Sequence, residues 1–113
     1  MSSYSAGLFA EWVAGWFLRL HGFRILKRRY VTGRGTGRAE IDIIAQRDDL
    51  IVFAEVKNRP TAMMGLDAVT FEQRKRLRRA AETYLRRIRW TGTARFDVIV
   101  ARALRVTWVK GAI

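Results

Sequence analysis

Three residues in the middle of the chain have the types and the spacing for metal-assisted chemistry: Asp42, Glu55 and Lys57. Asp42 lies in a run of alternating apolar residues over 40–46, and Glu55 and Lys57 end a second such run over 50–57. Alternation of this kind is typical of strands, so the two runs predict a hairpin. Because Glu55 and Lys57 are two residues apart, they share one face of their strand.

The register of this hairpin decides whether the two carboxylates meet. A two-residue loop at 48–49 places Asp42 directly opposite Glu55, and Glu40 opposite Lys57. A register that differs by one residue would place the two carboxylates on opposite faces of the sheet. The other face of the hairpin is expected to be apolar and to carry Ile41, Ile43, Ala45, Val52, Ala54 and Val56.

Facing carboxylates repel each other unless a cation lies between them. Carboxylate oxygens suit a hard divalent ion, so Asp42 and Glu55 are candidate ligands for Mg²⁺ or Mn²⁺. Such an ion activates water and neutralises charge on a phosphodiester, and Lys57 could orient the water or stabilise the developing charge. The short motif Glu-Val-Lys is also common on solvated strands, so its weight comes from Asp42 at the matching register and from the basic chain around it.

Glu11 is a candidate third carboxylate. The residues from Ser5, a candidate N-cap, to about Leu20 are apolar almost all round, which predicts a heavily buried helix ended by His21 and Gly22. An ionised carboxylate on such a helix needs a partner. Two interpretations stay open: Glu11 reaches a metal at the hairpin, or it pairs with an arginine or lies at a solvent-facing edge.

The composition indicates one globular domain over residues 1–113 with a polyanionic partner. Half of the residues are hydrophobic, and 22 lysines and arginines outnumber 10 acidic residues, a net charge of +12. A field of this size favours nucleic acid over the alternatives of a solvated basic surface or anionic lipid. The absence of cysteine excludes disulfides and thiolate zinc sites, and no apolar run reaches the ~20 residues of a membrane span. We expect a cytoplasmic protein that contacts no membrane and uses no small-molecule cofactor.

Arginine-rich segments are the candidate contacts to a nucleic-acid backbone, because arginine suits phosphate recognition. Glycines at 33, 35 and 37 form a basic loop that is not a nucleotide P-loop, since a strand follows it, and that can equally be a plain linker. The helix expected from Asp67 or Thr70 to about Arg89 has an apolar stripe and an otherwise basic surface. The candidate nucleic-acid-binding residues are Arg34, Arg38, Arg59, Gln73, Arg74, Arg78 and Arg79.

The remaining apolar runs complete an α/β architecture. Strands are expected over 23–31, 95–101 and 104–109, and a flexible loop over 58–66. The order is helix, three strands, helix, two strands, which predicts a mixed sheet flanked by helices. Asp97 is expected to pair with Arg95 or a helix N-terminus, and the four tryptophans are expected in core or subunit contacts rather than in base stacking.

An ordered set of motifs runs from about Gly7 to Val100. The motifs are Gly7-x-x-x-Glu11-x-x-Ala14, Gly22-Phe-x-Ile-Leu26, Glu40-Ile-Asp42, Val52-Phe-x-Glu-Val-Lys-x-Arg59, Ala68-Val-Thr70, Ala80-Ala81-x-x-Tyr-Leu85 and Arg95-Phe-Asp97. Together they resemble the small bacterial YraN-like family. Three features depart from that family's usual pattern: Ala39 in place of glycine, Gln73-Arg74 in place of Lys-Gln, and the tail Trp-Val-Lys-Gly-Ala-Ile113.

The YraN-like family is related to the Holliday-junction resolvases and the restriction-endonuclease-like nucleases of the PD-(D/E)xK superfamily. The resemblance implies a restriction-endonuclease-like fold and a Mg²⁺-dependent nuclease site at Asp42, Glu55 and Lys57, with Glu11 matching a carboxylate on the first helix of the resolvases. It also implies action on DNA, including branched DNA, as a homodimer. The alternative is a non-catalytic nucleic-acid-binding module that keeps the fold, with Asp42 and Glu55 paired to Lys57 and nearby arginines; an RNA-associated factor is a third interpretation.

Overall fold

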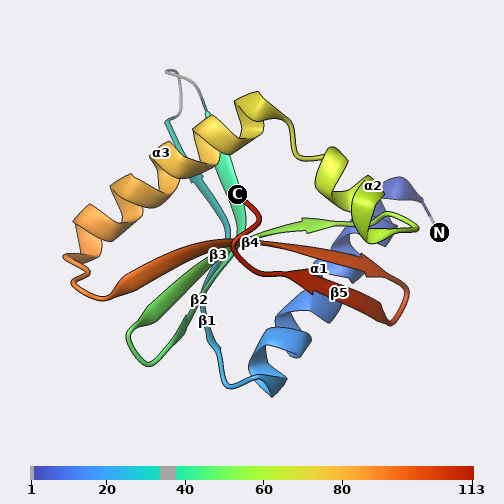
Figure 1. The fold of residues 1–113 in the computed structure, drawn as a ribbon, viewed down its shortest axis with the longest axis horizontal. Coiled ribbons are helices and arrows are strands. Elements are labelled where there is room, and N and C mark those ends of the chain that lie inside the picture. Colours follow the sequence, from blue (N-terminus) through green and yellow to red (C-terminus); the bar gives the residue numbers. More distant parts are fainter. Residues whose placement is uncertain (1, 34–37) are drawn as a thin grey trace.

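The computed structural model describes residues 2–33 and 38–113. Within these residues the chain forms a mixed five-stranded sheet with helices on both faces (Figure 1). In chain order the elements are α1 (Ser3–Leu20), β1 (Arg24–Thr32), β2 (Ala39–Arg47), β3 (Leu50–Lys57), α2 (Ala62–Asp67), α3 (Phe71–Ile88), β4 (Thr93–Arg102) and β5 (Arg105–Val109). The expected α/β class with a mixed sheet flanked by helices is confirmed, and this architecture is consistent with a nuclease-like fold.

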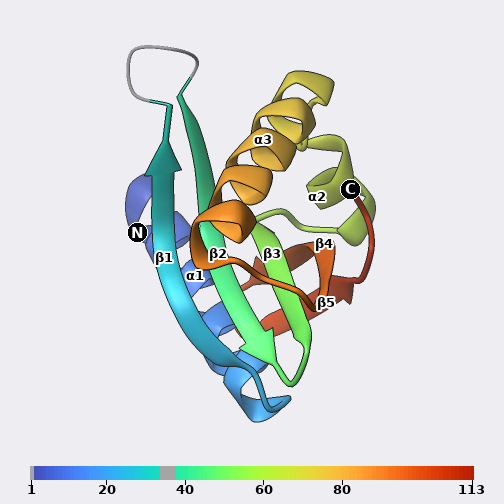
Figure 2. The same ribbon diagram turned by 90° about the vertical axis from the view of Figure 1, so that its left-hand side faces the viewer.

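The strands lie in the sheet in the order in which they occur in the chain, β1-β2-β3-β4-β5. Neighbouring strands are antiparallel except for β3 and β4, which are parallel. A parallel pair needs a crossover connection, and α2 and α3 supply it. Figure 2 shows α3 in front of the sheet and α1 behind it. The sheet is therefore covered on both faces, and the polar residues at its rim are the ones free to meet a ligand.

Each face of the sheet has its own apolar core. Under α3, Phe53 stacks on Phe96 with ring centroids 5.4 Å apart and meets Tyr84 edge to face at 6.2 Å. Under α1, Leu18 is fully buried against a second set of strand residues, which includes Val52 and Ile99. These two cores fix the middle of β3 from both sides, so the strand that carries Glu55 and Lys57 is held rigidly.

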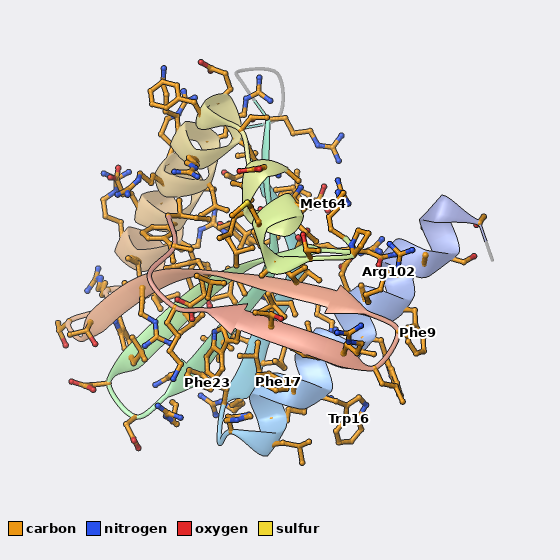
Figure 3. The ribbon with its side chains drawn as sticks, turned by 45° about the vertical axis from the view of Figure 1, so that its right-hand side comes forward. Phe9, Trp16, Phe17, Phe23, Met64 and Arg102 are labelled. Carbon is orange, nitrogen blue, oxygen red and sulfur yellow. The ribbon has the colours of Figure 1, made fainter. Side chains whose placement is uncertain are left out.

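Helix α1 is less buried than its composition predicts. Ser2, not Ser5, is its N-cap, since the Ser2 hydroxyl accepts a hydrogen bond from the Ser5 N–H at 3.1 Å. Trp12, Trp16 and Leu20 are 54%, 48% and 80% exposed, and Figure 3 shows Trp16 on the outer side of the helix. The spacing of four residues places these side chains on one stripe that points away from the sheet. The expectation of a heavily buried helix is wrong for this stripe.

The segment after β3 is partly helical, which corrects the expectation of a flexible loop over 58–66. The Thr61 hydroxyl caps α2 by accepting from the Met64 N–H at 3.2 Å, and Gly65 is buried against Val100 of β4. A side chain at Gly65 would collide with Val100, so the glycine allows α2 to lie close to the sheet. Helix α3 begins after Thr70, one of the two predicted starts.

Element boundaries otherwise lie within two residues of the prediction, and β3 has the predicted bounds. Within the described ranges 2–33 and 38–113, no helix is both long and apolar enough to cross a membrane.

Candidate active site

The predicted register of the central hairpin is confirmed. Arg47 pairs with Leu50, as a two-residue loop requires, and the ladder continues to Ile43 opposite Ala54. The next two residues in this register are Asp42 and Glu55, and here the regular pairing ends. In its place, the Val56 N–H donates a hydrogen bond to Asp42 Oδ2 at 2.8 Å. The two acidic residues therefore meet at the point where β2 and β3 separate.

Asp42 is also an irregular point on its other side, where it neighbours Arg29 of β1. The flanking pairs Arg28–Ile43 and Tyr30–Ile41 are regular, but Arg29 has a left-handed φ of 51°, which is uncommon for a residue with a side chain. The faces of β2 exchange at Asp42, since Ile41 lies in the core under α3 and Ile43 in the core under α1. The expectation that the two isoleucines share a face is wrong for this reason.

Glu55 is a buried carboxyl group with an unsatisfied oxygen. Its residue is 3% exposed, and Oε2 has no hydrogen-bond partner among the described residues. Burial and the hydrogen-bonding contact with the Asp42 carboxyl group raise the pKa of Glu55 to about 10, and Lys57 opposes part of this rise. The metal-free pair therefore holds a proton at neutral pH, which is how two adjacent carboxyl groups avoid repulsion.

The donor set of this pair fits a divalent cation. Asp42 uses Oδ2 for the Val56 N–H, which leaves Oδ1 for another partner, and Glu55 presents the unsatisfied Oε2. Mg²⁺ is commonly held by only one or two carboxylates and completed by water and phosphate oxygens. In the part of the chain that the structure describes, no three acidic, histidine or cysteine side chains come close enough to form a larger metal cluster.

Glu11 does not join the pair in this structure. Arg29 donates to both of its carboxylate oxygens, Nε to Oε1 and Nη2 to Oε2, each at 3.2 Å. This is the second of the two interpretations that the sequence left open. The link ties α1 to the irregular point of β1 that lies beside Asp42. A metal-binding role for Glu11 stays a prediction, and it would require the Arg29 contact to open.

Lys57 stands one strand period beyond Glu55 on β3. Lys57 is partly exposed and lines an open polar pocket of about 490 Å³ at the end of β3. Asn58 lines the same pocket, and its buried side-chain oxygen has no partner among the described residues. Asn58 was not among the predicted site residues, although a polar residue directly after Glu-Val-Lys is a usable signal.

The predicted nucleic-acid-binding residues fall into two groups. Arg38 and Gln73 line one pocket of about 350 Å³ with Glu40 and Arg76, which lies between the start of β2 and the first turns of α3. Arg59 lies instead at the polar pocket beside Lys57. Arg74, Arg78 and Arg79 belong with the first group and are exposed on α3. Arg34 lies outside the described residues.

Asp97 has the structural role that its sequence context predicts. Arg95 donates to both carboxylate oxygens at 2.8 and 2.9 Å, and Trp108 Nε1 and the Gly111 N–H donate to the same group at 2.8 and 2.9 Å. The residue is fully buried. Four hydrogen bonds satisfy the carboxylate, so Asp97 joins β4 to β5 and to the C-terminal segment and has no free oxygen directed to the hairpin.

Comparison with known proteins places the chain among bacterial relatives. The family model for the uncharacterised protein family UPF0102 matches residues 10–101. A UPF0102 protein of Paramagnetospirillum magneticum is 38% identical over 102 residues, which cover 88% of this chain and 79% of the relative. One from Mesorhizobium japonicum is 41% identical over 99 residues, covering 86% and 76%. One from Bartonella tribocorum is 38% identical over 110 residues, covering 96% and 80%.

Proposed function

The chain belongs to the uncharacterised protein family UPF0102, also called the YraN family, and from the geometry of its central hairpin we propose that it is a metal-dependent DNA endonuclease. The observation that carries the proposal is the meeting of Asp42 and Glu55 at the end of the β2–β3 ladder, with one buried carboxylate oxygen unsatisfied. A sheet gains nothing from this arrangement unless a cation occupies it, because burying an unsatisfied carboxyl group costs free energy.

Each of the three residues has a distinct role in the proposed site. Asp42, oriented by the Val56 N–H, and Glu55, fixed by the rigid strand β3, hold the ion. When bound, Mg²⁺ or Mn²⁺ supplies a Lewis acid and an activated water for phosphodiester hydrolysis. Lys57 is partly exposed beside the pair, and its ammonium group stabilises negative charge on the phosphate and orients the attacking water.

The basic surface of α3 supports DNA as the substrate. This surface begins at the pocket that Gln73 and Arg76 form with Arg38, next to Glu40 and hence close to Asp42 in the same strand. Only one of the helix's cations, Lys75, has an acidic partner among the described residues, Glu72 at 3.8 Å. Unpaired arginines in a row along a helix suit a row of phosphates. The surface would hold the strand while the hairpin cleaves it.

A second candidate is a non-catalytic nucleic-acid-binding module. It is favoured by the Glu11–Arg29 ion pair, which keeps a third carboxylate away from the hairpin. A binding module of this kind requires Asp42 and Glu55 to pair with Lys57 or with arginines. Among the described residues no ion pair of this kind is present, which argues against the module.

Calorimetric titration with Mn²⁺ tests the metal site directly. We expect one binding event for the wild type that is lost in Asp42→Asn and retained in Asp67→Asn, a control that removes an exposed carboxylate on α2. The titration is repeated with a short DNA duplex, because a phosphate oxygen can complete the coordination. Failure of the wild type to bind Mn²⁺ in both settings would refute the enzyme and leave the binding module.

Cleavage of linear and branched DNA tests the chemistry. Lys57→Ala should abolish Mn²⁺-dependent cleavage while leaving affinity for uncleaved DNA with hydroxyl ends nearly unchanged, because the basic surface of α3 is intact. Wild-type protein that binds Mn²⁺ and DNA together but never cleaves any of the substrates would contradict the proposal.

A further inference from the structure

A second cluster of cations lies at the end of β3, on the opposite side of Lys57 from the basic surface of α3. Arg59 and Arg102 line the polar pocket of about 490 Å³ together with Lys57, and Arg105 joins Arg59 and Arg102 at the small cavity next to it. The pocket is bounded on its far side by the first turns of α1. Figure 3 shows Arg102 at the end of β4, beside α1. We call these four residues, Lys57, Arg59, Arg102 and Arg105, the basic pocket.

The basic pocket gathers like charges without compensation. Arg102 and Arg105 face each other across the β4–β5 hairpin, an arrangement that is destabilising by itself. Within residues 2–33 and 38–113, no carboxylate lines either cavity, and none of the ion pairs includes a member of this cluster. A concave site with several unpaired cations on different walls is complementary to a compact polyanion.

Two features next to the basic pocket also favour a negatively charged ligand. The N-terminal end of α1 closes the pocket at Ala6 and Gly7 and has no acidic residue in its first turn, so its partial positive charge is not neutralised. The Asn58 amide, whose buried oxygen has no partner among the described residues, can turn to present its N–H₂ group to an acceptor.

We propose that the basic pocket binds the terminal phosphate of a DNA strand, so that the protein recognises strand ends, nicks or flaps that carry a phosphomonoester. A monoester phosphate has three free oxygens and a charge of about −1.5 to −2 near neutral pH, whereas a backbone diester has a single charge and two free oxygens. Cations on β3, on the segment after it and on β4 surround such a group better than they follow a continuous backbone.

The inference rests on the proposed function, because it places the strand end next to the proposed metal site. Lys57 belongs to the basic pocket and follows Glu55 by two residues, roughly 7 Å along the strand. A strand whose terminal phosphate occupies the pocket therefore has a bond near its end beside Asp42 and Glu55. The substrate class is DNA with a phosphorylated end, and the bond cleaved lies within a short distance of that end.

Binding to short duplexes in EDTA, without cleavage, tests the basic pocket. The duplexes carry a 5′-phosphate, a 3′-phosphate or only hydroxyl groups at their ends. We expect one phosphorylated form to bind on the order of tenfold more tightly than the hydroxyl form, as for loss of a charge-assisted hydrogen bond. Arg102→Gln should abolish this preference, and Arg24→Gln, which removes an exposed arginine at the start of β1, should preserve it.

Three results would overturn the assignment. The first is equal affinity for all of the duplexes, and the second is an end preference that persists in Arg102→Gln combined with Arg105→Gln. The third is competition by inorganic phosphate that is as effective as competition by a phosphorylated duplex, which would indicate a site for free anions. Comparing this measurement with the Mn²⁺ titration of the wild type separates the two proposals. An end preference in a wild type that binds no Mn²⁺ supports the pocket and refutes the nuclease, while Mn²⁺ binding by the wild type without an end preference refutes the pocket and leaves the nuclease.

Discussion

The backbone N–H of Val56 donates a hydrogen bond to Asp42 Oδ2 at 2.8 Å, so a side chain closes the gap where the ladder between β2 and β3 ends. This contact orients Asp42 and places its carboxyl group against that of Glu55. Because Glu55 is buried and Asp42 is partly exposed, the pair has one anchored member and one that faces solvent. A ligand can therefore reach the pair from the rim of the sheet.

The protonation of Glu55 predicts a distinctive dependence of stability on pH. Its pKa in the folded protein is raised from 4.5 to about 10, so between these values the folded state binds more protons than the unfolded state. Stability from this group is complete at low pH and is lost as pH rises. In EDTA, the free energy of unfolding of the wild type should fall with pH relative to that of Glu55→Gln, by at most about 1.4 kcal/mol per pH unit.

Urea denaturation over this pH range measures the difference. Mn²⁺ should reverse the trend, because the ion displaces the proton and binds more tightly as pH rises. Parallel pH profiles of wild type and Glu55→Gln in EDTA would show that Glu55 is ionised in the folded protein.

The exposed arginines of α3 predict a change in the salt dependence of DNA binding. Arg78→Gln combined with Arg79→Gln should weaken binding to any duplex and reduce the slope of log K against log salt by roughly 2, about one for each lost phosphate contact. Fluorescence anisotropy between roughly 50 and 200 mM salt gives the slope. Arg19→Gln combined with Arg24→Gln removes the same charge from the end of α1 and the start of β1. An equal change of the slope in this control would indicate that the net charge of the protein, and not direct contacts of Arg78 and Arg79 with phosphates, sets the salt dependence.

Asp97→Asn is predicted to destabilise the protein without affecting its metal site. The substitution removes the charge that Arg95, Trp108 and the Gly111 N–H all approach in a fully buried position. Loss of one partner of a buried ion pair costs on the order of 3 kcal/mol. Thermal unfolding measures the loss, and Mn²⁺ titration below the transition should match the wild type. A normal melting temperature would mean that the network contributes little.

The exposed apolar stripe of α1 predicts self-association, consistent with the homodimer that the family resemblance implies. Trp12, Trp16 and Leu20 border a groove of about 400 Å³ whose other wall includes Leu104 and Val106 of the β4–β5 hairpin. We expect a second copy of the chain to cover this groove. Sedimentation should give a dimer for the wild type, a monomer for Trp16→Glu and a dimer for the control Met63→Glu, which changes an exposed residue of α2. A monomeric wild type would contradict the expectation.

Local sequence rules were sufficient for the hairpin and for the Asp97 contact with Arg95. The two-residue loop at 48–49 fixes the register by counting, and the register alone brings Asp42 opposite Glu55. The pairing of Asp97 with Arg95 follows from their spacing of two residues in one strand, which places both on the same face. The Trp108 and Gly111 donors come from distant parts of the chain, and no spacing rule reaches them.

The sequence by itself determined the order of the elements other than α2, the positive net charge and the juxtaposition of the two carboxylates, because these depend on composition, on periodicity and on short connections. Only the tertiary structure decided the partner of Glu11, the outward direction of Trp16 and the meeting of Arg59, Arg102 and Arg105. An apolar helix has no local signal that says which side faces the sheet. Residues brought together by the parallel pairing of β3 and β4 are about forty positions apart, so their contact depends on the crossover and not on any spacing in the chain.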